Sequence, residues 1–128
     1  AQGVIMGTPF LLAEECPIHP RLKQALIDAS ELDTMIIMRS IQNGHRVWVN
    51  AAARKVAELE QKGAPLEDIL QVAGGDRAKK MYEEGDLEAG VISCGQGIGL
   101  VNKIMPLKDI VETIIHAADD LRKRLAQI

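Results

Sequence analysis

Aromatic residues and cysteines are both scarce in this sequence of 128 residues. Phe10, Trp48 and Tyr82 are its only aromatic residues, so a core has to be built from Leu, Ile, Val, Met and Ala side chains. The two cysteines, Cys16 and Cys94, form no Cys-x-x-Cys motif and cannot build the disulfide framework of a small secreted domain. This cysteine usage favours a reducing, cytoplasmic compartment.

The sequence also lacks an excess of positive charge and any long hydrophobic run. Its formal net charge of -3 argues against nucleic acid or an anionic membrane as a partner. No apolar run approaches the roughly 18 residues of a membrane-spanning helix, and residues 1–4 lack the basic start of a signal peptide. Apolar residues make up 47% and charged residues 26%, which is typical of one ordinary globular domain with a core.

The first half of the chain predicts a strand, a helix and a hairpin. The apolar run Gly3–Met6, followed by Gly7-Thr8-Pro9, is typical of a buried strand in a parallel sheet. We expect this strand to belong to a longer protein, since nothing precedes it to pair with and the chain lacks an initiating Met. Pro20 and the apolar spacing after it predict a helix that ends near Ser30. The apolar runs on either side of Asn43-Gly44 predict a β-hairpin.

The second half predicts mainly helices. Residues 51–62 have a helical pattern that Gly63 ends. Pro65 opens a short helix, and Asp76 is expected to cap another that runs to Glu84. After these, residues 91–93 form a brief extended segment.

The last helix is the clearest predicted element. Its apolar residues follow the spacing of one buried stripe: Leu107, Ile110, Val111, Ile114, Ile115, Ala118, Leu121 and Leu125. Acidic residues lie in its early turns and Arg122, Lys123 and Arg124 in its last, which suits the helix dipole.

Two glycine turns could bind a ligand. Gly7 permits close approach of a ligand to the backbone, and Thr8 offers an N–H and a hydroxyl to phosphate oxygens, at the strand end where α/β folds bind ligands. An ordinary turn also explains Gly7-Thr8. Residues 95–99 look like a phosphate loop, but Leu100 breaks the dinucleotide pattern G-x-G-x-x-G. The second turn therefore predicts either ligand contacts from its backbone and Gln96, or a tightly packed helix entry.

Neither the three histidines nor Cys94 has a sequence context that indicates a catalytic role. His19, His45 and His116 have no partner at metal or triad spacing, so we expect structural or solvated roles and no metal site. Cys94 precedes a possible helix start that could lower its pKa, but inert burial is the simpler interpretation. Taken alone, these residues describe an α+β domain of unknown role.

The motifs together resemble one family, the nitronate monooxygenases, formerly called 2-nitropropane dioxygenases. The flavin-containing enoyl-acyl carrier protein reductases share the same layout. The ordered segments that carry the resemblance are Gly3–Phe10, Glu14–Cys16, His19-Pro20, Asp33-Thr34, Arg46–Asn50, Glu84–Asp86 and Ser93–Leu100.

The resemblance implies an α/β parent fold, a TIM barrel that binds FMN at the C-terminal face of its strands. This chain would then be mainly helical with a few short strands. Residues 1–19 would be the last barrel strand and phosphate-binding loop, residues 20–103 a mostly helical lid, and residues 104–128 a helix that packs on the barrel. The implied cofactor-binding residues are Ile5, Met6, Gly7 and Thr8 at the phosphate, with Gln96 and Gly97 towards the flavin and substrate.

The resemblance also implies what this chain does not supply. A full barrel has eight strands in about 250 residues, and the family's catalytic His belongs to the part that precedes these residues, so the catalytic residues stay unknown. Position 5 is Ile where relatives often have Gln, which matters little if the contact is made by the backbone. We expect the missing barrel portion or a second copy of the chain as a partner, beside a small-molecule substrate.

Three functions follow as hypotheses. The first is oxidation of an alkyl nitronate by molecular oxygen on FMN, with this chain alone inactive. The second is reduction of an enoyl thioester by NAD(P)H through FMN. The third is a non-catalytic helical module, which a lack of exposed apolar surface on the last helix would favour.

Overall fold

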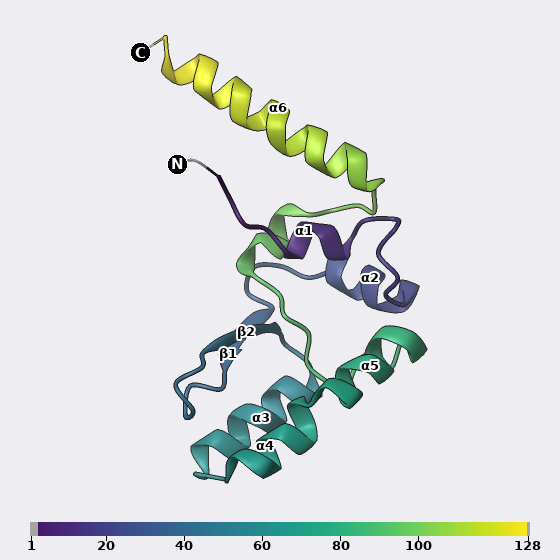
Figure 1. The fold of residues 1–128 in the computed structure, drawn as a ribbon, viewed down its shortest axis with the longest axis vertical. Helices are drawn as coiled ribbons and strands as arrows, with labels where there is room; N and C mark the ends of the chain where they lie inside the picture. Colours follow the sequence, from purple (N-terminus) through teal and green to yellow (C-terminus); the bar gives the residue numbers. More distant parts are fainter. Residues whose placement is uncertain (1–2, 128) are drawn as a thin grey trace.

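The computed structural model describes residues 3–127, so residues 1–2 and 128, at the outer ends of the expected strand and helix segments, lie outside it. A small hairpin and two helices form one end of an elongated molecule, a second group of helices forms the middle, and the last helix forms the other end (Figure 1). The elements are α1 (Thr8–Leu11), α2 (Pro20–Ile27), β1 (Thr34–Ile37), β2 (His45–Trp48), α3 (Ala51–Gln61), α4 (Leu66–Ala73), α5 (Gly75–Glu84), the 3-10 helix η1 (Gln96–Leu100) and α6 (Leu107–Leu125).

The predicted hairpin is confirmed, although its turn differs from the one expected. Strands β1 and β2 pair antiparallel, with Ile37 opposite His45 at the closed end. The connection spans residues 38–44 and reverses direction at Met38 and Gln42, whose φ angles are 61° and 57°. Asn43 donates its N–H to the Met38 carbonyl at 3.1 Å. Asn43-Gly44 therefore closes a longer loop and is not itself a two-residue turn.

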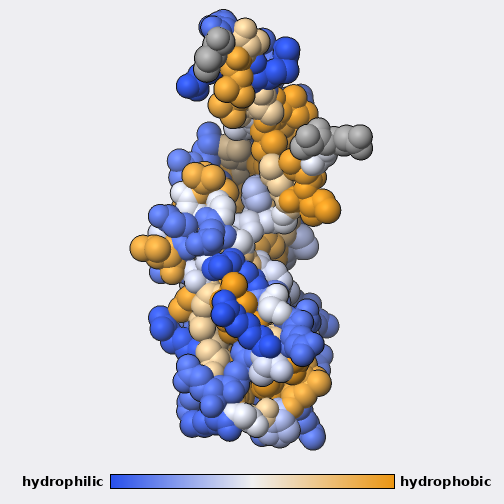
Figure 2. Space-filling model, turned by 90° about the vertical axis from the view of Figure 1, so that its left-hand side faces the viewer, coloured by the Kyte–Doolittle hydropathy of each residue, from blue (hydrophilic) through white to orange (hydrophobic). Residues whose placement is uncertain are grey.

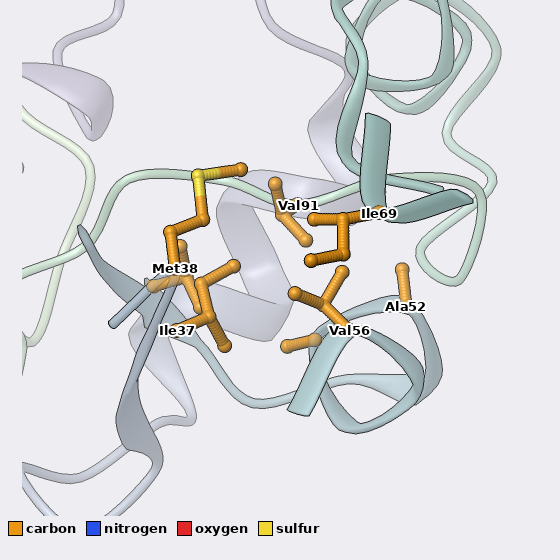
Figure 3. Close-up of a cluster of buried hydrophobic side chains, with 8 residues drawn as sticks. Ile37, Met38, Ala52, Val56, Ile69 and Val91 are labelled. Carbon is orange, nitrogen blue, oxygen red and sulfur yellow. The ribbon is translucent and has the colours of Figure 1, made fainter. Parts of the chain in front are cut away.

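The hairpin and helices α3 and α4 enclose the first core (Figure 3). Its buried side chains are Ile37, Met38, Val47, Ala52, Ala53, Val56, Ile69 and Val91. Helix α3 confirms the predicted helix, and Gly63, at φ 67°, ends it as expected. The expected cap at Asp76 is wrong: Gly74 precedes α5, and Asp76 lies in the first turn, where a carboxylate suits the positive helix end.

A second core lies between α2, α5 and η1. Its buried side chains are Leu12, Leu22, Leu26, Met81, Ile92, Cys94 and Ile98. The predicted extended segment joins this core to the hairpin, since Trp48 donates to the Ile92 carbonyl and Cys94 donates to the Arg46 carbonyl, both at 3.1 Å. These bonds fix the segment that leads into the glycine loop against strand β2.

The predicted strand at Gly3–Met6 is not formed in this chain. Residues 3–7 have no regular structure, and the side chain of Ile5 is fully exposed. A strand needs a hydrogen-bonded neighbour, and the two strands among residues 3–127 pair with each other. The apolar pattern alone therefore did not suffice to form the strand.

The predicted buried stripe of the last helix is also corrected. Helix α6 forms as expected, but among its stripe residues only Ile110 is buried, whereas Ile115, Leu121 and Leu125 are 58%, 53% and 67% exposed. Figure 2 shows hydrophobic surface beside hydrophilic surface in the upper part of the molecule, the end that α6 forms in Figure 1. None of the helices within residues 3–127 combines the length and the hydrophobicity that a membrane span requires.

Candidate cofactor-binding cleft

A cleft of about 580 Å³ lies between the segment before α1, the end of η1 and helix α6. Its volume is that of an ordinary ligand site. Five of the six predicted cofactor-binding residues line it, namely Ile5, Met6, Gly7, Thr8 and Gly97. Gln96, the sixth, does not line the cleft and is exposed at the start of η1. The structure thus brings the two predicted glycine turns to one site.

A hydrogen bond joins the two turns directly. The N–H of Gly95 donates to Oγ1 of Thr8 at 2.9 Å, across 87 residues of sequence. The Thr8 hydroxyl accepts this bond and keeps its own hydrogen available for a ligand oxygen. Thr8 therefore both fastens the glycine loop and can contribute a donor to the cleft.

The glycines of these turns have different roles. A Cβ atom placed on Gly7 or Gly97 would meet no atom within 4 Å, so both face open space where a ligand can approach the backbone. A Cβ atom on Gly99 would lie 2.6 Å from a carboxylate oxygen of Glu31 and 2.9 Å from its backbone nitrogen. The loop therefore shows tight packing at Gly99, and it leaves open space beside Gly97, where ligand approach stays a prediction.

Several cleft residues were not expected from the sequence. Asn102, Lys103 and Thr113 add polar groups, and Lys103 is the one cation among the described lining residues. Asn102 and Lys103 directly follow the glycine loop, which could have drawn attention to them. Thr113 lies on α6, and its place in the cleft depends on how that helix docks.

The start of α6 is held against the end of α1 by backbone and side-chain bonds. Glu14 donates its N–H to the Met105 carbonyl at 2.9 Å. The carboxylate of Glu15 accepts the N–H of Leu107 at 2.8 Å and so satisfies a free donor at the helix start. These bonds set the position of α6 as one wall of the cleft.

Cys94 is buried, and His45 and His19 take part in hydrogen bonds within the protein. Burial raises the pKa of the Cys94 thiol to about 11, opposite to the lowering considered from its sequence position. His45 Nε2 lies 2.7 Å from Ser93 Oγ, and His19 Nδ1 accepts the N–H of Arg21 at 3.1 Å. Within residues 3–127 no three His, Cys, Asp or Glu side chains are grouped to hold a metal ion.

The cleft fits a ligand with an anionic end and an apolar body, such as FMN. Open glycine backbone, the Thr8 hydroxyl and Lys103 provide donors for a phosphate. Ile110 and Ile114 provide an apolar wall on α6.

Comparison with known proteins agrees with this chemistry. A family model described as nitronate monooxygenase matches residues 1–117. The solved structure of FabK from Thermotoga maritima matches with a TM-score of 0.83 and 31% identity, covering 95% of this chain and 38% of that one. A single-residue mutant of the same FabK matches with a TM-score of 0.73 and 30% identity, covering 95% of this chain and 35% of that one.

The chain thus spans little more than a third of the length of the solved structures it matches. The family has a TIM-barrel fold, and its members and the FabK proteins are FMN-dependent enzymes. Because the family model covers most of the sequence and the FabK structures superpose on nearly all of it, the chain belongs to the nitronate monooxygenase family.

Proposed function

We propose that this chain contributes half of the phosphate grip and one wall of the FMN site in an oxidoreductase that oxidises alkyl nitronates with molecular oxygen. The observation that carries the proposal is the Thr8–Gly95 hydrogen bond, which joins the two predicted cofactor turns at one cleft. FMN, when bound, supplies the electron-accepting chemistry of the reaction.

The residues of the cleft have separate tasks in this proposal. The backbone of Ile5 and Met6 and the donors of Gly7 and Thr8 hold the phosphate, which Lys103 neutralises in part. We assign Gly97 to the flavin and substrate side, together with Gln96, which is exposed outside the cleft at the start of η1. The apolar wall of α6 excludes water from the site. We assign the catalytic base to none of these residues, since the resemblance places the family's catalytic His in the preceding part of the barrel.

The proposal also gives each segment a place in a barrel. Residues 1–19 supply the last strand and its loop, residues 20–103 cover the site as a lid, and residues 104–128 close the barrel as a helix. The unpaired segment at residues 3–7 and the exposed apolar face of α6 support this assignment, because both lack the neighbours that such elements need. The proposed partners are therefore further barrel strands, or a second copy of this chain, together with a small-molecule substrate.

We place the protein in the cytoplasm on the basis of its cysteines. Cys16 and Cys94 are both free thiols in the structure. Free thiols are typical of a reducing compartment.

A second candidate function is the reduction of an enoyl thioester by NAD(P)H through FMN. The FabK structures support it, because FabK is an FMN-dependent enoyl-acyl carrier protein reductase, and the comparisons together fit it about as well as nitronate oxidation. The two reactions share the phosphate grip and differ in the electron donor. The substrate side of the cleft has to accept a long thioester in one case and a small nitronate in the other.

Two turnover assays distinguish these functions, on the FMN-loaded protein that includes the proposed barrel portion, because this chain alone is expected to be inactive. Oxygen consumption with propyl-2-nitronate, without a nicotinamide, is the expected result. Oxidation of NADH or NADPH that depends on a crotonyl thioester would instead establish the second candidate. A preparation that neither shows the visible absorbance of oxidised flavin nor binds added FMN would refute both.

A further inference from the structure

Lys23 on α2 is buried, with 6% of its surface exposed, although lysine rarely occupies such positions. Its Nζ donates to the Ala13 carbonyl at 2.6 Å and to the Glu14 carbonyl at 3.1 Å. None of the ion pairs among residues 3–127 involves Lys23. Burial of an ammonium group without a carboxylate costs free energy unless the group makes hydrogen bonds. The two carbonyls provide the acceptors that stabilise the buried Lys23 side chain.

The two carbonyls belong to the turn of residues 12–15, which directly follows α1. Both residues lie beyond Leu11, the last residue of α1, and the Ala13 carbonyl also accepts the Cys16 N–H at 3.1 Å, so Lys23 adds to a turn that the backbone itself closes. The same turn contacts the start of α6 through three bonds. Met105 donates to the Leu12 carbonyl at 3.4 Å, Glu14 donates to the Met105 carbonyl at 2.9 Å, and Leu107 donates to the Glu15 carboxylate at 2.8 Å.

This turn therefore connects the two walls of the cleft. One wall begins at Thr8, the first residue of α1, and the other includes Ile110 and Thr113 on α6. A shift of the turn would move α6 relative to Thr8 and change the width of the cleft. Lys23 itself does not line the cleft.

We propose that Lys23 is a positioning residue for the cofactor cleft: its ammonium group locks the turn of residues 12–15 and thereby holds α1 and α6 at the separation that FMN requires. The inference rests on the proposed function, because it takes FMN as the ligand of the cleft. It predicts that removal of the ammonium group loosens the cleft and leaves the hairpin core intact.

FMN titration of the Lys23→Met protein tests the proposal. Methionine keeps the apolar stem and removes both hydrogen bonds, so the Kd for FMN is expected to rise about tenfold, with an altered visible circular dichroism of the bound flavin. Lys23→Arg can donate to both carbonyls and is expected to restore most of the affinity. The matched control is Lys79→Met on the exposed face of α5, which should stay within about twofold of the unmodified protein.

Amide hydrogen exchange without FMN provides the second readout. In Lys23→Met, exchange at residues 13–16 and 105–109 should accelerate about tenfold, while strand β1 keeps its protection. If Lys23→Met does not fold, Lys23→Gln replaces it, with an expected rise in Kd of about threefold, since one neutral donor remains. An unchanged Kd and unchanged exchange would overturn the proposal, as would an equal acceleration in β1. If the unmodified protein binds no FMN, the proposed function fails, and exchange alone decides whether Lys23 locks the turn.

Discussion

The hydroxyl group of Thr8 has two roles, one in holding the glycine loop and one in the proposed binding of the ligand. Its oxygen accepts the N–H of Gly95 at 2.9 Å, and its residue lines the cleft. We expect Thr8→Val, which keeps the side-chain shape, to raise the Kd for FMN about tenfold, because it leaves the Gly95 N–H without an acceptor and removes a donor to the phosphate. Fluorescence titration with FMN measures this.

Thr34→Val is the matched control for Thr8→Val. Thr34 accepts a hydrogen bond from Arg46 Nη1, also at 2.9 Å, in the hairpin and away from the cleft residues. Its Kd for FMN should stay within about twofold. Equal effects of the two variants would contradict the role of Thr8 at the cofactor.

Burial makes the Cys94 thiol unreactive and links it to stability at high pH. Burial raises its pKa from an ordinary value of 9.0 to about 11, so between these values the folded state binds more protons than the unfolded state. Stability is therefore expected to fall as pH rises from 9 to 11. Denaturation midpoints across this range should decrease less steeply in Cys94→Ala than in the unmodified chain. Disulfide-exchange labelling of folded Cys94 at pH 8 should be at least about tenfold slower than that of a free thiol.

Alanine substitutions at Gly63 and Gly85 distinguish the cost of backbone strain from the cost of a steric clash. Both adopt positive φ, at 67° and 71°, and both end helices. A Cβ atom on Gly63 would meet nothing within 4 Å, whereas a Cβ atom on Gly85 would clash with the His19 ring. We expect Gly63→Ala to cost about 1 kcal/mol of unfolding free energy and Gly85→Ala about 3 kcal/mol. Urea denaturation compares them, and equal losses would show that the ring of His19 moves aside freely.

At the scale of elements, Asn50 joins the hairpin, α3 and the segment before the glycine loop. Its Oδ1 accepts the Ala53 N–H at 2.8 Å and so caps α3, while its Nδ2 donates to the carbonyls of Leu87 at 2.7 Å and Gly90 at 2.8 Å. The residue is buried, so a lost partner is not replaced readily by water. The end of the Arg46–Asn50 motif is therefore a junction of three elements.

Replacement of Asn50 tests this junction. Asn50→Ala removes all three bonds and should cost about 3–4 kcal/mol of unfolding free energy. Asn50→Asp keeps the cap of α3 and loses only the two donated bonds, but it places a charge near two carbonyls. It is therefore expected to be similarly destabilised at neutral pH and to recover partly at low pH, where the acid can donate. A denaturation series in pH would contradict the junction if the Asp variant showed no recovery.

The elements themselves follow mostly from local patterns. Helices α2, α3 and α6 and the hairpin were predicted because apolar periodicity and turn residues act over a few positions. The cap at Asp76 and the strand at Gly3–Met6 were wrong for different reasons. Gly74 has the extended backbone of an N-cap, so α5 starts at Gly75, one residue before Asp76, and a strand requires a partner that a local pattern does not contain.

At the scale of the whole molecule, the apolar face of α6 is a departure from a self-contained fold. Most of its stripe is exposed, together with Val4 and Ile5 in the preceding segment. Large exposed apolar surfaces mark contacts with other chains or elements. This observation agrees with a helix that packs on a barrel and disfavours the hypothesis of an isolated helical module.

Ile115→Lys tests the use of this face. Ile115 is 58% exposed, and a charge there should weaken self-association of the 128-residue chain about thirtyfold, because burial of an isoleucine contributes on the order of 2 kcal/mol. His116→Lys adds a comparable charge at the next exposed position and should change association much less. Sedimentation velocity measures both. Equal association constants for the two variants would show that the apolar face of α6 is not the contact surface.

The sequence by itself determined most of the helices and the hairpin, because these depend on residues near one another in the chain, whereas the two cores join distant segments such as Val47 with Val91 and Leu12 with Ile98. It also indicated both glycine turns and, through their order with the other motifs, the family. Only the tertiary structure decided that Thr8 meets Gly95, that Lys103 and Thr113 share their cleft, and that the stripe of α6 is exposed. These relations join residues that are distant in sequence, and their geometry depends on the path of the whole chain through both cores.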